Sequence, residues 1–226
     1  MNYSISSKKY INFNFRIIVI LVVFHLIARL YISIFNPEFL TIPNIFLLDV
    51  ERNIPTLYSG ISLMFSALIL YFIGHIEKQT KIKFNYYLMA LLFLFLSCDE
   101  IFMIHEISGR YLRNLLNPSS FLYFAWVIPY GIMTILVSLY FYNFIKMMPK
   151  KIFHLIIISG ILFVGGELVL EMVGGFIFTN NNKEVNFIYL TVSLLEEVLS
   201  MCGIALFNYS ILNLLSTKNL NIKFIN

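Results

Sequence analysis

The sequence predicts an all-α, polytopic integral membrane bundle of about six transmembrane helices with both termini in the cytoplasm. Three observations support this prediction. Of the 226 residues, 59% are hydrophobic and only 12% are charged, about half the charged share of a soluble domain. Six apolar stretches approach or exceed the roughly 20 residues that a helix needs to cross a bilayer. The cations are distributed unevenly over the connections between these stretches.

The composition also excludes several classes of function. A globular core of this size cannot hide so much apolar surface, so the main solvent must be lipid. This excludes a soluble enzyme and a disordered scaffold. The net charge of +4 does not indicate a nucleic-acid partner, because the Lys and Arg residues are scattered over short loops and form no patch. Cys98 and Cys202 both lie in apolar stretches and provide no disulfide framework.

The predicted spans form a single transmembrane helical domain that covers residues 1–226, because the short connections leave no room for a second domain. The first span follows Lys8, Lys9 and Arg16, which resemble the basic flank of a signal peptide. No small-residue cleavage site follows this flank, so we expect a retained signal anchor. The six spans are residues 17–35, 57–73, 86–104, 121–145, 152–178 and 187–212.

The loop cations determine the expected orientation. Cytoplasmic connections carry an excess of Lys and Arg, and here one side would carry eleven cations and the other side four. Both termini are therefore expected in the cytoplasm, and the chain in the cell inner (plasma) membrane. The external connections would be residues 36–56, 105–120 and 179–186, of which the first is apolar enough to cap the bundle or lie on the membrane surface. The eleven are Lys8, Lys9, Arg16, Lys78, Lys81, Lys83, Lys146, Lys150, Lys151, Lys218 and Lys223, and the four are Arg52, Arg110, Arg113 and Lys183.

Acidic residues within the spans are the main functional signal. A charged residue at the centre of a transmembrane helix costs about 2.5–3.5 kcal/mol, so we expect these side chains to face the interior of the bundle. The third, fifth and sixth spans each carry a pair, and a rise of about 1.5 Å per residue puts all three pairs in the outer half of the membrane. With two further residues at the external end of the third span, the candidates are Asp99, Glu100, His105, Glu106, Glu167, Glu171, Glu196 and Glu197.

Helical spacing and charge balance sharpen this signal. Glu167 and Glu171 are four residues apart and share a helical face. Asp99 and Glu106 are seven residues apart and would do the same. Arg29 is the one basic residue inside a span that could reach this layer, together with His25 one turn away. Since one Arg cannot balance six carboxylates, the sequence predicts raised pKa values, a bound cation or a cationic substrate.

The fifth predicted span combines two of these acids with five glycines. Small residues let the backbones of transmembrane helices approach closely. We therefore expect this span to be central and tightly packed. Its glycines are Gly160, Gly165, Gly166, Gly174 and Gly175.

Four segments carry distinctive motifs. They are Arg-Asn-Ile-Pro-Thr-Leu-Tyr-Ser at residues 52–59, Asp-Glu with His-Glu at 99–106, Gly-Gly-Glu with Glu-Met at 165–172, and Glu-Glu with Met and Gly at 196–203. Together these motifs resemble an uncharacterised group of six-span bacterial inner-membrane proteins. The resemblance covers nearly the whole chain and implies a common bundle with an acidic site. It implies no particular activity.

The sequence leaves three classes of function open. The first is a membrane-embedded enzyme that acts on a lipid-like substrate, with a divalent metal ion as a candidate cofactor because carboxylates and imidazole bind such ions. The second is a proton- or cation-coupled carrier, since intramembrane acids mark ion paths. The third is a structural or accessory subunit of a membrane complex. In the enzyme, the metal ligands would come from the eight candidates, and the catalytic residues would be Glu100, His105, Glu167 and Glu197.

Overall fold

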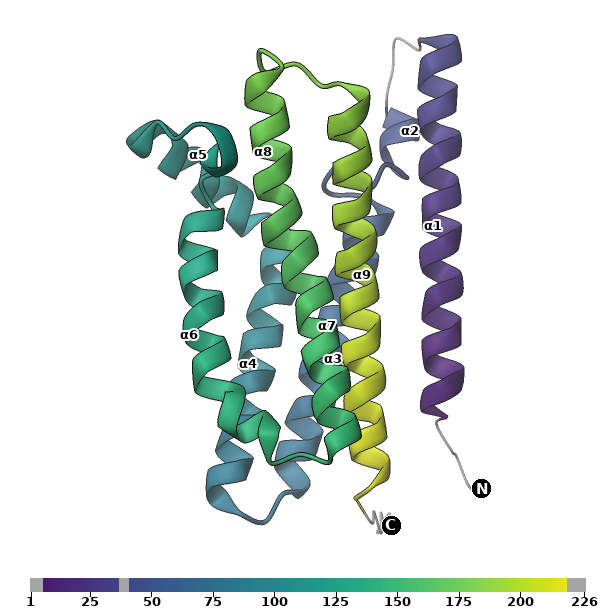
Figure 1. Ribbon diagram of the computed structural model, residues 1–226. Coiled ribbons are helices and arrows are strands. Elements are labelled where there is room, and N and C mark those ends of the chain that lie inside the picture. Colours follow the sequence, from purple (N-terminus) through teal and green to yellow (C-terminus); the bar gives the residue numbers. More distant parts are fainter. Residues whose placement is uncertain (1–5, 37–40, 219–226) are drawn as a thin grey trace.

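The computed structural model of the chain describes residues 6–36 and 41–218, and these residues form helices and connections without any strand. Within them, six helices are long and apolar enough to cross a membrane, which confirms the predicted all-helical, multi-pass bundle (Figure 1). The six are α1 (Ser7–Phe35), α3 (Ile54–Ile76), α4 (Thr80–Phe102), α6 (Val127–Lys146), the continuous segment Lys150–Asn180 and α9 (Phe187–Ser216).

Several shorter elements make up the rest of the described helical structure. The segment Lys150–Asn180 consists of α7 (Lys150–Val164), the π-helix η2 (Gly165–Leu170) and α8 (Glu171–Asn180). The others are α2 (Thr41–Asn44), α5 (Ile104–Leu116) and the 3-10 turn η1 (Ser120–Leu122).

Both ends of the described chain reach the same side of the bundle. The first turn of α1 and the last turn of α9 lie together, while α5 and the α8–α9 connection lie at the opposite end (Figure 1). The opposite end is termed the α5 end below. Which end faces the cytoplasm stays a prediction.

Several boundaries differ from those expected, for local reasons. Helix α1 begins well before residue 17, at Ser7, because the Ser6 side chain accepts a hydrogen bond from Lys9 N–H and caps the helix. Helix α6 begins only at Val127, because the chain first makes the η1 turn. The expected external connection at residues 105–120 is mostly the short helix α5.

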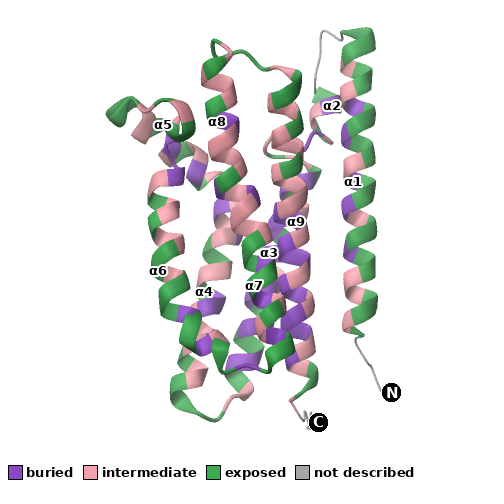
Figure 2. Cartoon of the chain, in the orientation of Figure 1, coloured by how far each residue is buried: buried purple, intermediate pink, exposed green. Residues whose placement is uncertain are grey.

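The main cluster of buried apolar side chains lies away from the α5 end and draws on α3, α4, α6, α7 and α9 (Figure 2). Leu70, Ile73 and Ile211 are fully buried there. Closer to the middle of the bundle, Ser66 Oγ donates a hydrogen bond to Asn208 Oδ1 at 2.7 Å, and Asn208 Nδ2 donates to the Ser62 carbonyl at 2.9 Å. These bonds satisfy buried polar groups between α3 and α9, as small polar residues commonly do in membrane bundles.

Helix α1 packs on the bundle through one face only. Its buried residues recur every three or four positions and pack against α9 and the connection after α1, while most of its other apolar side chains are exposed to the surrounding lipid. The buried residues are Asn14, Ile18, Leu21, His25 and Ala28.

The connection between α2 and α3 folds into the α5 end of the bundle. Leu47 and Leu48 are buried, and the Leu48 N–H donates to His25 Nδ1 at 3.0 Å. The Asn53 side chain donates to the carbonyls of Leu47 and Val50 at 2.5 and 2.6 Å, and its Oδ1 accepts from Thr56 N–H as the cap of α3. This connection therefore covers the end of the bundle.

Candidate functional site

Two cavities meet near the α5 end. The larger, the apolar cavity, has a volume of about 620 Å³ and is lined mainly by apolar side chains of α4, α6, α7 and α9. The smaller, the acidic cavity, has a volume of about 110 Å³ and is lined mainly by polar and charged side chains. Because some residues line both cavities, the two spaces share a boundary. The shared residues are Glu100, His105, Trp126 and Glu167.

The structure brings together the candidate residues named from the sequence. Asp99 lines the apolar cavity beside the boundary, and the other candidates line the acidic cavity. Asp99 and His105 are buried, whereas the glutamates are half-buried because their carboxylates face the cavity. The candidates of the acidic cavity are Glu100, His105, Glu106, Glu167, Glu171, Glu196 and Glu197.

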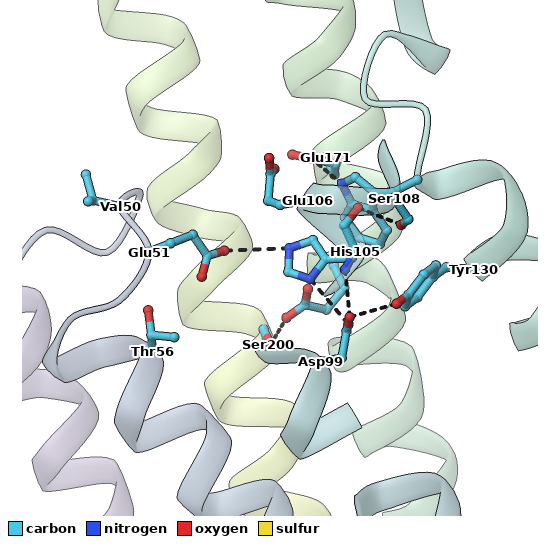
Figure 3. A network of polar contacts seen from close by, with 12 residues as sticks. Val50, Glu51, Thr56, Asp99, His105, Glu106, Ser108, Tyr130, Glu171 and Ser200 are labelled. Atoms are coloured by element: carbon cyan, nitrogen blue, oxygen red, sulfur yellow. Dashed lines mark hydrogen bonds and ion pairs between the residues drawn. The ribbon is translucent and has the colours of Figure 1, made fainter. Parts of the chain in front are cut away.

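His105 stands at the centre of a polar network (Figure 3). Its Nδ1 is 3.3 Å from Asp99 Oδ2, and its Nε2 is 3.6 Å from Glu51 Oε1. The Tyr130 hydroxyl donates to Asp99 Oδ1 at 2.7 Å. Burial alone would lower the pKa of His105, but the interactions with the Asp99 and Glu51 carboxylates outweigh it and raise that pKa to about 11. The imidazole is therefore held as a cation between two carboxylates.

A break in the chain at Met103 positions His105. The sequence predicted that the third span would continue through this point, with Asp99 and Glu106 on one face. Instead α4 ends at Phe102, and Met103 has a left-handed backbone with φ of 57°. Helix α5 then starts at Ile104, and Asp99 Oδ1 accepts a hydrogen bond from His105 N–H in its first turn at 2.7 Å. An anion at a helix N-terminus is favourable, so this carboxylate stabilises the turn.

The π-helix η2 carries Glu167 to the boundary between the cavities. Ser200 of α9 donates a hydrogen bond to the Glu167 carboxylate. A Cβ on the neighbouring Gly166 would lie 2.6 Å from the Glu196 carbonyl oxygen, so only glycine lets η2 approach α9 this closely. Single π-helical turns are rare and occur frequently at functional sites.

Aromatic side chains form part of the same boundary. Trp126 Nε1 donates to Glu171 Oε1 at 2.9 Å, and its ring lies 4.9 Å from the His105 ring, centroid to centroid. Phe124 and Tyr189 also line the acidic cavity. No sequence motif indicated Trp126 as a site residue, because it lies outside the acidic motifs.

The connection before α3 supplies two acidic residues that sequence reasoning missed. Asp49 and Glu51 both line the acidic cavity, and Glu51 faces His105. The acids predicted for the site lie within the spans or at the external end of the third span, whereas these two lie in a loop that folds inward. The apolar residues around them, Leu47 and Leu48, were the signal that the loop is covered.

Arg29 and His25 have a role other than the one expected. The sequence indicated that Arg29 could reach the acidic layer, with His25 one turn away, but Arg29 forms an ion pair with Asp49 of the loop. His25 accepts the hydrogen bond from Leu48 N–H. Both residues therefore hold the α2–α3 connection against α1, and Arg29 balances one loop carboxylate rather than the pairs of the spans.

Carboxylates outnumber cations around the acidic cavity. Among the described residues that line it, His105 is the one basic side chain. Carboxylates in close proximity disfavour each other's ionisation, so the cavity requires protons or a cation. Nowhere in residues 6–36 and 41–218 are three His, Cys, Asp or Glu side chains arranged to hold a metal ion. The acidic lining is Asp49, Glu51, Glu100, Glu106, Glu167, Glu171, Glu196 and Glu197.

Comparison with known proteins identifies one family. The model of the domain of unknown function DUF8692 matches residues 16–214, a range that includes every residue lining the two cavities. No curated protein and no solved structure matches the chain. Because the family match covers most of its length, the chain belongs to the DUF8692 family.

Proposed function

We propose that the protein is a membrane-embedded enzyme that performs acid–base chemistry on a lipid-like substrate. The substrate's chain occupies the apolar cavity, and its polar head reaches the boundary with the acidic cavity. One observation carries this proposal: the two cavities share Glu100, His105 and Glu167. A polar reacting group at the end of an apolar chain would meet titratable side chains at that boundary.

The apolar cavity has the size and the access that such a substrate needs. Its volume of about 620 Å³ lies within the range of about 300–1,000 Å³ typical of ligand sites. Between Val127 and Phe141, no side chain of α6 is buried. On the facing helix, Ile161 lines the cavity and is 66% exposed. A substrate can therefore enter sideways from the bilayer between α6 and α7.

The side chains at the boundary suit proton transfer to and from a bound head group. His105 stays protonated near neutral pH, and its positive charge, held between Asp99 and Glu51, lies beside the carboxylates that exchange the proton. Glu100 and Glu167 are the carboxylates at the shared boundary, and they would accept or donate the proton. Glu197, inside the acidic cavity, would exchange that proton with water.

A divalent metal ion stays a candidate cofactor of this proposal, with ligands drawn from the acidic lining. Elemental analysis of the purified protein tests it directly, because stoichiometric metal that is lost in Glu167→Gln would assign the chemistry to the ion. The proposal also keeps the inner (plasma) membrane as the location, with the cation-rich connections on its cytoplasmic side.

The decisive test follows lipid composition. Purified protein is reconstituted into liposomes made from the membrane lipids of its expression host, and the lipids are followed over time by mass spectrometry. We expect one species to decrease while a product accumulates, and Glu167→Gln and His105→Gln to abolish the change. Glu184→Gln is the matched control, since Glu184 is exposed in the α8–α9 connection.

The other classes of function give different results in the same liposomes. A carrier predicts cation or proton flux that Glu167→Gln abolishes, without any change in lipid composition. An accessory subunit predicts neither flux nor conversion, but a stable complex after mild extraction. Folded protein that converts no lipid would overturn the enzyme proposal.

A further inference from the structure

The two cavities together fit one class of ligand. We propose that the substrate is a single-chain amphiphile with a protonated amine as its head group. The amine lies in the acidic cavity, and the chain extends into the apolar cavity. This inference rests on the proposed function and adds the chemistry of its substrate.

The acidic cavity indicates that the ligand's head group is positively charged. His105 is the only basic residue in its described lining and is already engaged by Asp99 and Glu51. Glu51 Oε2 is buried and has no hydrogen-bond partner within the described residues. An ammonium group has three N–H donors and no acceptor, so it can satisfy several carboxylates at once. A negative or neutral head would leave these carboxylates without a cation.

Two features favour an organic ammonium over a bare divalent ion. A bound divalent ion is coordinated at short range by several ligand atoms, and the described residues contain no group of three side chains arranged in this way. Phe124, Trp126 and Tyr189 contribute aromatic rings to the acidic cavity. Aromatic faces attract ammonium groups within about 6 Å of the ring centre. A carboxylate-lined and partly aromatic space therefore matches an amine.

The shape of the apolar cavity bears on the ligand's hydrocarbon chain. On α6 the cavity is lined from Tyr130 to Ile145, which corresponds to about 20 Å at a rise of about 1.5 Å per residue. A volume of about 620 Å³ over that length gives a mean cross-section of about 30 Å². The cavity is therefore long and narrow, which suits an extended hydrocarbon chain.

Gly160 and Gly165 help to keep this space open. Both line the apolar cavity, and a Cβ at either position would meet nothing within 4 Å. They are therefore not required for close helix contact. A larger side chain at Gly160 would project into the space that we assign to the chain, without touching the acidic cavity.

The experiment uses Trp126 as its reporter. Trp126 is the only tryptophan of the sequence and lines both cavities, so a bromine-labelled chain bound beside it quenches the protein's fluorescence. The full chain in nanodiscs is titrated with brominated hexadecylamine, hexadecanol and hexadecanoate, with empty nanodiscs correcting for partition into lipid. We expect the amine to bind at least about tenfold more tightly than the alcohol, and the carboxylate most weakly.

Variants separate the contributions of head and chain. Glu100→Gln and Glu196→Gln should reduce the preference for the amine over the alcohol, because each removes one negative charge from the cavity. Gly160→Leu should weaken binding of the amine and the alcohol to a similar extent, because it obstructs the chain. Glu184→Gln, in the exposed connection, should change nothing. If a glutamate variant does not fold, the affinities of the unaltered protein for the three head groups still test whether it prefers an amine.

Two results would overturn the inference: equal affinity for amine and alcohol, or a preference for the carboxylate. These results are distinguishable from failure of the proposed function. Amine-selective binding without any lipid conversion would support the amine as the ligand and contradict the proposed enzyme activity. Conversion of a lipid with a neutral or anionic head would support the enzyme activity and contradict the amine as the substrate's head group.

Discussion

Helices α3 and α6 both span the membrane, yet their surroundings differ strongly. In the most apolar stretch of α3, 56% of the residues are buried, against 11% in that of α6. Helix α3 packs along its length against α4 and α9, whereas the buried residues of α6, such as Val127 and Phe141, lie near its ends. One part of the bundle is therefore a scaffold, and the other is the wall of a cavity that opens to lipid.

The glycines of the segment Lys150–Asn180 show the same division at single residues. All five were expected to allow close packing, and this holds for Gly166, which lies against the backbone of α9. The expectation is wrong for Gly160 and Gly165, which have no neighbour within 4 Å of a built Cβ and line the apolar cavity. Within a single span, the same residue type thus serves packing at one position and open space at another.

The largest effect that tests this division is expected from Gly166→Leu. Its Cβ would meet backbone atoms of Glu196 and Ser200 at 2.6 and 3.0 Å, and backbone cannot move aside easily. We expect a loss of about 3 kcal/mol or more of stability, at or above the usual range for overpacking. Thermal unfolding in detergent, together with the yield of monodisperse protein, measures it. Gly160→Leu is the matched control, and its unfolding temperature should be close to that of the unaltered protein. An equal loss of stability in both variants would contradict the distinction between scaffold and cavity wall.

The second effect concerns the ion network at the α5 end. The pKa of His105 in the folded protein is about 11, above the ordinary value of about 6.5, so the folded state holds a proton that the unfolded state releases. The resulting stabilisation is fully present below about pH 6.5 and is lost as the pH rises through about 11. We expect stability to fall on the order of 2 kcal/mol between pH 7 and pH 9, and His105→Gln to remove most of this slope. Thermal unfolding across that pH range provides the measurement.

The opposite end of the bundle supplies the control for this pH dependence. Lys218 Nζ lies 2.5 Å from Glu77 Oε2, and this hydrogen bond lowers the pKa of Glu77. Stability from this pair is therefore present above about pH 4.5 and is lost as the pH falls below it. Glu77→Gln should leave the slope between pH 7 and pH 9 unchanged. If Glu77→Gln flattened that slope, the alkaline sensitivity would not belong to His105.

The sequence predicted the scaffold better than the site, for physical reasons. Apolar length alone defines a span, and the cost of a charge in lipid directs acids such as Glu100, Glu167 and Glu197 inward. The turn at Met103 could not be predicted, because left-handed backbone is uncommon for a non-glycine residue and a methionine inside an apolar stretch does not indicate it. Nor could the inward fold of Glu51, since it depends on side-chain to backbone hydrogen bonds over the α2–α3 connection.

A smaller effect is expected from neutralising one carboxylate of the acidic cavity. Glu197 lies among other carboxylates in the lining of the acidic cavity. Glu197→Gln should therefore be as stable as the unaltered protein or more stable by about 1 kcal/mol, because it relieves repulsion. Thermal unfolding measures this change in stability, and Glu184→Gln controls for the replacement of a glutamate by glutamine at an exposed position. A lower unfolding temperature together with lost metal would instead indicate an ion that holds the helices together.

The smallest effect on stability is expected from Asn182→Cys, which tests which end of the bundle faces the cytoplasm. Asn182 is exposed in the α8–α9 connection at the α5 end, where the cation distribution predicts the external side. Cys98 and Cys202 are first replaced by Ala, so that the introduced thiol alone reacts. A membrane-impermeant maleimide added to intact cells should label Asn182→Cys, while Lys78→Cys at the opposite end should react only after lysis. Labelling of Lys78→Cys in intact cells would show that the orientation in the membrane is the opposite of the predicted one. The acidic cavity would then face the cytoplasm, and its protons would be exchanged with that compartment.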